Sequence, residues 1–146
     1  MKFKVKTFNQ LTTSELYDIL QLRSEVFVVE QNCVYQDIDG KDQKALHILG
    51  IKNNKLIAYT RLFKGGDYFD EASIGRVVVK QSERKYGYGH DLMKFSIETI
   101  EEKFNTSTIK IGAQTYLQKF YESHGFKKIG KEYIEDGIPH IHMVKE

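Results

Sequence analysis

Two glycines separated by one residue stand in the stretch RKYGYGH at residues 84–90. An apolar run, IGRVVV at residues 74–79, precedes it, and a run with helical spacing follows. A loop that leaves a buried strand and enters a helix presents free backbone N–H groups, and the helix N-terminus adds partial positive charge. Glycines let such a backbone bend and approach a ligand without a Cβ in the way. The stretch therefore predicts a site for a phosphate or a similar anion.

The spacing of the glycines separates this loop from two common phosphate cradles. A P-loop requires G-x-x-x-x-G-K-[ST], and no glycine of this chain is followed by lysine and then serine or threonine. A dinucleotide fingerprint requires glycine or alanine three residues after the second glycine, where this chain has Leu92. What distinguishes the loop is Arg84, three residues before the first glycine. The plainer alternative is a glycine turn that only joins a strand to a helix.

The elements that must position this loop follow from the apolar pattern. Alternating apolar residues over residues 3–8 predict a first strand. Thr12 and Glu15 form the pattern of a capping box, and the helix that it starts is expected to reach about Val29. Residues 30–44 have no period and many turn formers, which predicts a long loop, and loops of this length are usually functional.

The second part of the chain predicts strands interrupted by two helices. Asn53 and Asn54 suit the tight turn of a hairpin over residues 45–63, and Gly125 suits the left-handed cap of a short helix. The other expected elements are a buried strand at 74–79, a helix at 89–104, a strand at 107–113, the short helix at 115–126 and a final hairpin at 127–145. This order indicates an α/β fold with a mixed sheet and few crossover helices, not a doubly wound sheet.

Composition narrows the class of protein. A chain of 146 residues fits a single domain over residues 1–146. The net charge of +2 and the scattered lysines give no indication of a nucleic-acid partner. Cys33 is the only cysteine, which excludes an internal disulfide and suits a reducing cytosol. The alternation in MKFKVKTF is unlike a signal peptide, and no apolar run is long enough to cross a bilayer, so we expect a cytoplasmic protein with no membrane partner.

A second strand–helix unit supplies a family resemblance. In AQTYLQKFYESHGF, residues 113–126, Gln114 stands where an asparagine is common, and Tyr121 follows seven residues later. With the R-x-x-G-x-G loop, this unit resembles the GNAT N-acetyltransferase superfamily. Residues 22–42, 74–79 and 133–143 further resemble the ElaA-like group of that superfamily, in the same order and over nearly the whole chain.

The resemblance implies the GNAT acyl-CoA N-acyltransferase fold, whose splayed sheet parts between its fourth and fifth strands to admit a pantetheine arm. It also implies direct transfer of an acetyl group from acetyl-CoA to a primary amine of a small molecule or peptide. The residues it assigns to acetyl-CoA are the backbone of Val77 and Val79, the loop residues Arg84, Lys85, Gly87, Tyr88 and Gly89, and Gln114.

The resemblance makes Tyr121 the candidate general acid, because a phenol is protonated at neutral pH and can give its proton to a departing thiolate. Its alternative is an aromatic residue of the core. The general base is left open: Glu30 and His140 are candidates, as are Glu135, Asp136, His47, His142 and a water chain.

Other residues have two interpretations each. Arg23, Arg61 and Arg76 either hold an acidic part of the acceptor or pair with Glu25, Glu30 and the aspartates. His140 and His142 would share one face of a strand, but no third metal ligand has suitable spacing, so surface residues are favoured. No histidine is identified that would activate Cys33 as a nucleophile.

Three classes of function are compatible with these residues. Tyr121 favours an enzyme over a non-catalytic acyl-CoA-binding or regulatory module, since a binding module needs no proton donor there. A plain interaction domain with a fortuitous glycine turn is the third. A homodimer is compatible with the sequence, although no exposed apolar stripe requires one.

Overall fold

The computed structural model describes residues 1–146, and its strands form two antiparallel sheets. The first sheet has the order β1-β2-β3-β4, and its strands are β1 Lys2–Thr7, β2 Leu46–Lys52, β3 Lys55–Phe63 and β4 Ser73–Val79. The second has the order β5-β7-β6, and its strands are β5 Ile109–Gln114, β6 Lys127–Glu135 and β7 Ile138–Lys145. The α-helices are α1 Thr13–Arg23, α2 Tyr88–Phe104 and α3 Gln118–Glu122. Shorter helical segments are η1 Phe8–Gln10, η2 Ser24–Glu30, η3 Asp42–Lys44, η4 Gln81–Tyr86 and η5 Thr115–Leu117.

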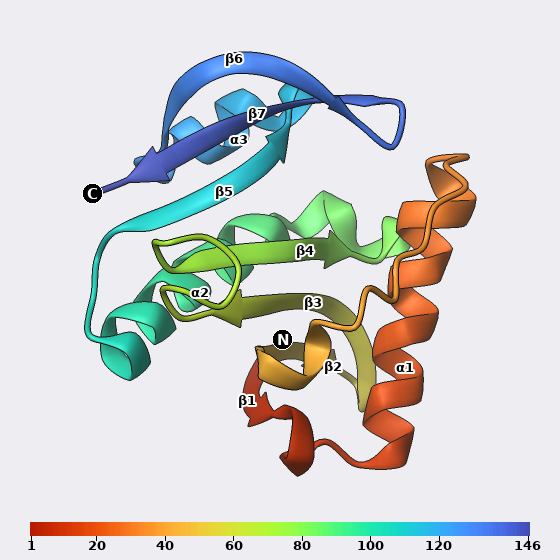
Figure 1. Ribbon diagram of the computed structural model, residues 1–146. Helices are drawn as coiled ribbons and strands as arrows, with labels where there is room; N and C mark the ends of the chain where they lie inside the picture. Colours follow the sequence, from red (N-terminus) through yellow and green to blue (C-terminus); the bar gives the residue numbers. More distant parts are fainter.

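Backbone hydrogen bonding joins the two sheets only where β4 and β5 begin. Ala72 and Ile109 form a single parallel bridge, in which the Lys110 N–H donates to the Ala72 carbonyl at 2.8 Å. Beyond this bridge β5 rises away from β4 toward their carboxyl ends (Figure 1). The side of β4 away from β3 therefore has no ladder partner, which confirms the expected parting of the fourth and fifth strands.

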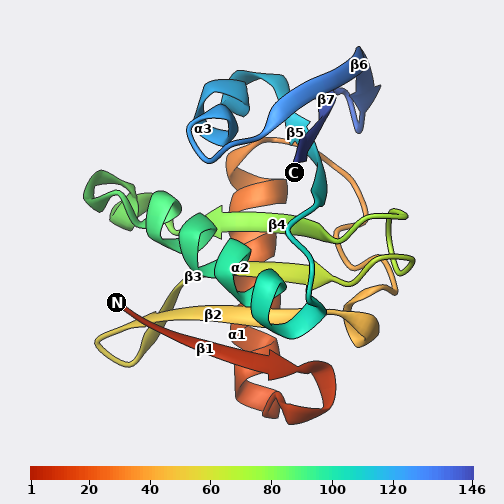
Figure 2. The same ribbon diagram turned by 90° about the vertical axis from the view of Figure 1, so that its left-hand side faces the viewer.

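Apolar side chains bury both faces of the first sheet. On one face, Leu92, Met93 and Ile100 of α2 pack with residues of both sheets in a core of 16 buried residues. On the other face, Ile19 and Leu22 of α1 pack in a smaller core of six buried residues. The two helices thus cover opposite faces of the sheet (Figure 2). The expected order of strands and helices is confirmed.

Local signals in the sequence explain several element boundaries. The Thr12 hydroxyl accepts from the Glu15 N–H at 3.1 Å, and the Glu15 carboxylate accepts from the Thr12 N–H at 2.9 Å, which is the expected capping box. Asn53 and Asn54 have φ of +52° and +63° in the β2–β3 turn, and Gly125 has φ of +90°. Inclusion of Phe8 in the first strand was wrong, because β1 ends at Thr7 and Phe8 begins a 3-10 turn.

The long first helix changes its winding after Arg23. Residues Ser24–Glu30 form a π-helix (η2), in which the Gln31 N–H donates to the Val26 carbonyl at 3.1 Å. The helix reaches Glu30, close to the expected end at Val29, but apolar spacing gave no sign of the wider turns. Such segments occur frequently at functional sites.

A β-bulge interrupts β4 beside its partner β3. The register shifts between Tyr59 and Arg61, and Arg76 takes a positive φ of +51°, which is uncommon for a residue with a side chain. The Thr60 hydroxyl donates to the Gly75 carbonyl at 2.7 Å and satisfies one group that the bulge leaves unpaired. The bulge aims the Arg76 side chain toward the long loop, at residues 37–39.

Charged residues protect the outer edge of the first sheet. β1 is an edge strand whose Lys2 and Lys4 are exposed, and lysines on an edge discourage pairing with another chain.

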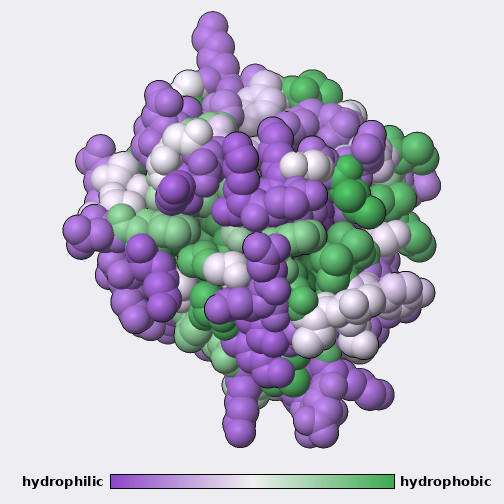
Figure 3. All heavy atoms as spheres, turned by 60° about the horizontal axis from the view of Figure 1, so that its bottom comes forward, coloured by the Kyte–Doolittle hydropathy of each residue, from purple (hydrophilic) through white to green (hydrophobic).

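Figure 3 shows the face at the bottom of Figure 1, where hydrophilic residues predominate and hydrophobic residues form a broken band. None of the helices is long and apolar enough to span a membrane.

Candidate active site

The glycine loop forms an uncapped N-terminus of α2 at the carboxyl end of β4. Gly87 has φ of +74° and is the N-cap of the helix, and no side chain accepts a hydrogen bond from the first turn. A helix of 17 residues leaves its first N–H groups without intrahelical partners, so those of Tyr88 and Gly89 are free for a ligand. The loop therefore has the geometry and the partial positive charge of an anion cradle.

The two glycines are expected to differ in their response to substitution. Gly87→Ala should cost about 1–2 kcal/mol of folding free energy, because alanine is strained at positive φ, and should also weaken CoA binding. Gly89→Ala should leave the melting temperature almost unchanged, since an added Cβ would lie 3.5 Å from the Phe120 ring, an ordinary contact. Because the family resemblance implies that the CoA diphosphate approaches this backbone closely, the variant should bind CoA about tenfold more weakly. Thermal denaturation and calorimetric titration of both variants with CoA measure the two effects.

Arg84 is held by two other segments. Its Nε donates to the Val79 carbonyl at 3.0 Å, and its Nη1 and Nη2 donate to the two oxygens of Glu30 at 2.5 and 2.9 Å. The side chains of Arg84 and Glu30 are 41% and 28% exposed, so solvent and a ligand can reach the pair. The neighbouring Lys85 is exposed, and its Nζ lies 5.3 Å from the centre of the Tyr86 ring.

Val77 and Val79 of β4 and Gln114 of β5 lie on the two strands that part. Val77 lies in the bulge and Val79 at the end of β4, on the strand whose free edge could pair with the amides of a pantetheine arm. Gln114 ends β5, and its amide exchanges hydrogen bonds with the Gln31 amide at 3.3 and 3.4 Å. The amide position of the second strand–helix unit is thus at the open end of the two strands.

Tyr121 is nearly buried in α3. Its ring packs edge-on against Phe120 and Phe126, as the core alternative expected. Its hydroxyl has no hydrogen-bond partner in the protein and is not among the fully enclosed polar atoms. Burial, and to a lesser degree the neighbouring Tyr116, raises the pKa of Tyr121. The phenol therefore remains protonated over the physiological range and has no competing acceptor for its proton.

His140 lies on β7 beside Gln114, at the same end of the second sheet. Its Nδ1 is 2.7 Å from the Ile138 carbonyl, and because a carbonyl only accepts, Nδ1 carries the proton. In the neutral form of the ring the lone pair is then on Nε2, which lies 3.6 Å from Glu135. Tyr133 stacks on the imidazole with ring centres 5.7 Å apart. His140 thus has a fixed tautomer with an available basic nitrogen.

His47 is placed differently from His140. It is fully buried, its Nε2 donates to the Asp42 carbonyl at 2.9 Å, and its Nδ1 accepts from the Tyr59 hydroxyl at 2.6 Å. Burial lowers the pKa of His47, so the imidazole stays neutral. Both ring nitrogens are hydrogen-bonded, and the bond to the Asp42 carbonyl helps to hold the long loop in place.

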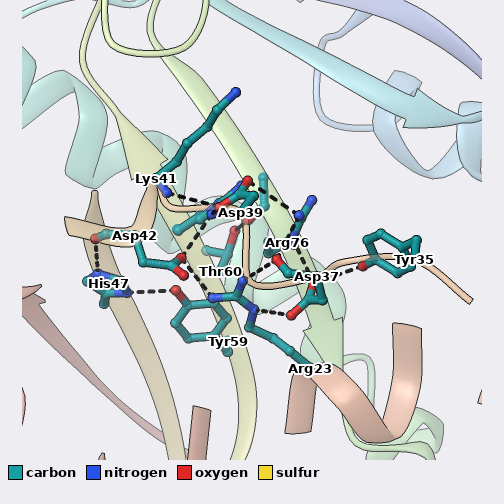
Figure 4. A network of polar contacts seen from close by, with 12 residues as sticks. Arg23, Tyr35, Asp37, Asp39, Lys41, Asp42, His47, Tyr59, Thr60 and Arg76 are labelled. Carbon is teal, nitrogen blue, oxygen red and sulfur yellow. Dashed lines mark hydrogen bonds and ion pairs between the residues drawn. The ribbon is translucent and has the colours of Figure 1, made fainter. Parts of the chain in front are cut away.

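The three arginines singled out by the sequence meet in one network with aspartates of the long loop, and Figure 4 shows Arg23 and Arg76 in it. Arg23 binds Asp37 and Asp42 at 2.8 Å each, and Arg61 binds Asp42 at 2.9 Å. Arg61 also donates to both oxygens of Asp39, at 2.6 and 2.8 Å. Arg23 and Arg61 are essentially inaccessible to solvent. Pairing with aspartates, one of the two interpretations left open, is therefore the arrangement seen, and Glu25 and Glu30 take no part in it.

Arg76 completes the network from the bulge of β4. Its Nε lies 2.8 Å from Asp37 Oδ1, and its Nη2 donates to the Asp37 carbonyl at 3.1 Å. The Tyr35 hydroxyl donates to the same Oδ1 at 2.8 Å. The Arg76 side chain is 21% exposed, which makes it the one arginine of the network that an acceptor could reach.

Sequence reasoning missed the partners of several site residues. It did not foresee that Glu30 holds Arg84, that Gln31 faces Gln114, or that the Cys33 thiol contacts the Asp136 carbonyl at 3.3 Å. These pairs join segments 54 to 103 residues apart, and no periodic pattern reports such contacts. One feature of the sequence could have predicted the network. The run DIDGKD at residues 37–42 contains three aspartates, which equals the number of arginines on the neighbouring elements.

Comparison with known proteins agrees with this geometry. A family model described as an acetyltransferase (GNAT) domain matches residues 10–146. The chain therefore belongs to the GNAT acetyltransferase family. Protein ElaA of Escherichia coli (strain K12) is 47% identical over 140 residues, which cover 94% of this chain and 92% of that protein. Within the family, the chain is a relative of ElaA.

Solved structures show the same fold. The crystal structure of Escherichia coli ElaA superposes with a TM-score of 0.93 at 43% identity, over the whole of both chains. An acyl-CoA N-acyltransferase from Pseudomonas aeruginosa has a TM-score of 0.94 at 38% identity, again over both whole chains. A GNAT family acetyltransferase from Elizabethkingia anophelis with acetyl-CoA bound has a TM-score of 0.66 at 18% identity, over 99% of this chain and 97% of that one, and shares the fold alone.

Proposed function

We propose that this protein transfers an acetyl group from acetyl-CoA directly to a primary amine of a small molecule or peptide in the cytoplasm. The observation that carries the proposal is the uncapped N-terminus of α2 at the carboxyl end of β4, beside a strand edge with no partner. The N-terminus of α2 would hold the diphosphate of acetyl-CoA, and the free edge of β4 would pair with its pantetheine amides. Membership in the GNAT family and the neighbour with bound acetyl-CoA support this choice of cosubstrate.

The protein's own groups suit the proton transfers of this reaction. The amine nitrogen must lose a proton as it forms a bond to the thioester carbon, and the sulfur must gain one as the C–S bond breaks. We assign the first proton to Nε2 of His140, whose tautomer is fixed by the Ile138 carbonyl. Glu30 is less suited as the base because both its oxygens are bound by Arg84. We assign the second proton to the Tyr121 hydroxyl, which has no other acceptor in the protein.

The network of arginines and aspartates would position the acceptor side. It fixes the loop at residues 35–42 against α1, β3 and β4, so that an acceptor meets a rigid wall and not a mobile loop. Arg23 and Arg61 are buried in ion pairs with aspartates, and we assign any contact with an acidic part of the acceptor to Arg76.

A panel of amines tests the proposal. Purified protein is incubated with acetyl-CoA and small or peptidyl primary amines, and the free thiol of released CoA is followed with a thiol reagent. We expect release above background hydrolysis with at least one amine, and an acetylated product by mass spectrometry. Binding of CoA without release for any amine would instead identify an acyl-CoA-binding module. If saturating acetyl-CoA does not raise the melting temperature, the protein is a plain interaction domain.

A further inference from the structure

The Glu30–Arg84 pair lies on a short segment that crosses between the two sheets. We call residues 30–33 the strap. Glu30 binds Arg84, which follows β4, whereas the next residue, Gln31, exchanges hydrogen bonds with Gln114 at the end of β5. Cys33 then contacts the carbonyl of Asp136 in the β6–β7 turn. The strap is therefore attached to both arms of the splayed sheet at the end where they part.

The end of the π-helix gives the strap this geometry. Glu30 is the last residue of η2, and Asn32 takes a positive φ of +49°, which turns the chain sharply. The N–H groups of Asn32 and Cys33 are bonded to the carbonyls of Val29 and Val28. Because its backbone is anchored to the helix, the strap holds the Glu30 carboxylate in a fixed place opposite the glycine loop.

The Glu30 carboxylate occupies Arg84 in the way a phosphate would. A guanidinium presents paired N–H donors that fit either a carboxylate or a phosphate, and both groups compete for the same fork. Each terminal nitrogen of Arg84 donates to one oxygen of Glu30, and its Nε donates to the Val79 carbonyl. In this state Arg84 adds no net charge to the cradle at Gly87–Gly89.

We propose that Glu30 is a positioning residue that stands in for the CoA diphosphate on Arg84 and is displaced when CoA binds. This inference rests on the proposed function, because it takes CoA as the ligand of the loop. Breaking the ion pair opposes binding, so Glu30 lowers the affinity for acetyl-CoA and for the product CoA alike. The consequence for turnover is faster release of CoA, a step that is often rate-limiting.

The variant Glu30→Gln tests this role, because it keeps the size of the side chain and removes its charge. We expect its dissociation constant for CoA, measured by calorimetry at low salt, to be about 2- to 5-fold lower than that of the wild type. The difference should shrink as salt is raised, since exposed charges are screened. Pantetheine has no diphosphate, and its affinity should be unchanged. The KM for acetyl-CoA should fall with the dissociation constant of CoA, and Glu30→Asp, which retains the charge, should restore part of the wild-type behaviour.

Glu25→Gln is the matched control for charge. Glu25 lies in the same helical segment, and its carboxylate is 3.6 Å from the Lys80 ammonium. The substitution therefore removes one negative charge without affecting a partner of Arg84. Its affinity for CoA should stay within twofold of the wild type, and Glu30→Gln should have no effect when Arg84 is replaced by glutamine.

Three results would overturn the inference. These are an unchanged or weaker affinity of Glu30→Gln for CoA, an equal shift in its affinity for pantetheine, and an equal effect of Glu25→Gln. If neither the wild type nor Glu30→Gln binds CoA at all, the proposed function falls and this inference with it. If the wild type binds CoA with the same affinity as Glu30→Gln, only the inference falls.

Discussion

Replacement of Tyr121 by phenylalanine is expected to lower kcat for acetyl transfer by about 10²- to 10³-fold, the usual contribution of a positioned general acid. The ring would still pack against Phe120 and Phe126, and the lost hydroxyl has no hydrogen-bond partner in the protein. Folding stability and the affinity for CoA should therefore stay close to those of the wild type. Steady-state kinetics with a good acceptor, together with thermal denaturation, measure these quantities.

Tyr116→Phe provides the control for this substitution. Tyr116 lies near Tyr121 but is 72% exposed, so loss of its hydroxyl should leave kcat unchanged. Because burial raises the pKa of Tyr121 above its ordinary value near 10, its proton is retained as pH rises. The wild-type rate should accordingly show no loss from Tyr121 ionisation up to about pH 10. Full turnover by Tyr121→Phe would remove the residue from the mechanism.

Removal of the Asp42 carboxylate is expected to cost about 3–5 kcal/mol of folding free energy. Oδ1 of Asp42 accepts from both Arg23 and Arg61, and these two guanidinium groups are almost completely buried. Asp42→Ala would leave their charge without its shared partner, which is far more costly than loss of a surface ion pair. Urea denaturation at neutral pH measures the change. The exposed Asp70→Ala is the control, expected within about 0.5 kcal/mol of the wild type.

The same carboxylates make stability depend on pH in the acidic range. Burial alone would raise the pKa of Asp42, but hydrogen bonds and charge from Arg23 and Arg61 outweigh it and lower the pKa. The pKa of Asp39 is lowered in the same way by Arg61 and Arg76. Between the depressed folded values and the ordinary value of about 3.9, the unfolded chain binds more protons, so this stabilisation is complete above about pH 5 and is lost as pH falls. Asp42→Ala should show a shallower loss of stability below pH 4 than the wild type, and an equal slope would exclude Asp42 from this effect.

The fold was accessible from the sequence because its signals are local. The Thr12–Glu15 cap, the Asn53–Asn54 turn and the left-handed Gly125 each report a boundary from a few neighbouring residues. Apolar spacing in α2 likewise reports the face that packs on the sheet. The π-helix at Ser24–Glu30 escaped prediction because apolar spacing gives no sign of its wider turns.

Only part of the candidate site could be predicted from the sequence, because the role of a charged residue depends on its partners in the fold. Glycine spacing and Tyr121 are features of the chain itself, whereas the roles of charged residues depend on which partners the fold brings to them. Arg61 is equally compatible with an acceptor and with an ion pair until the loop at residues 37–42 is seen to fold back over β3. Glu30 is one of several candidate bases in the sequence, and only the structure shows that Arg84 binds both of its oxygens. Long-range pairing of charges is the information that a single sequence does not contain.

The network of Arg23, Arg61, Arg76 and the loop aspartates also constrains how this protein can diverge. Three positive and three negative side chains balance one another, and two of the arginines have no solvent to compensate for a lost partner. A substitution at one position therefore creates a buried charge that only a second change can neutralise. In related sequences these six positions should change together, by loss of an arginine and an aspartate in the same lineage. A relative that kept both buried arginines but lost Asp42 should carry a new acidic residue nearby.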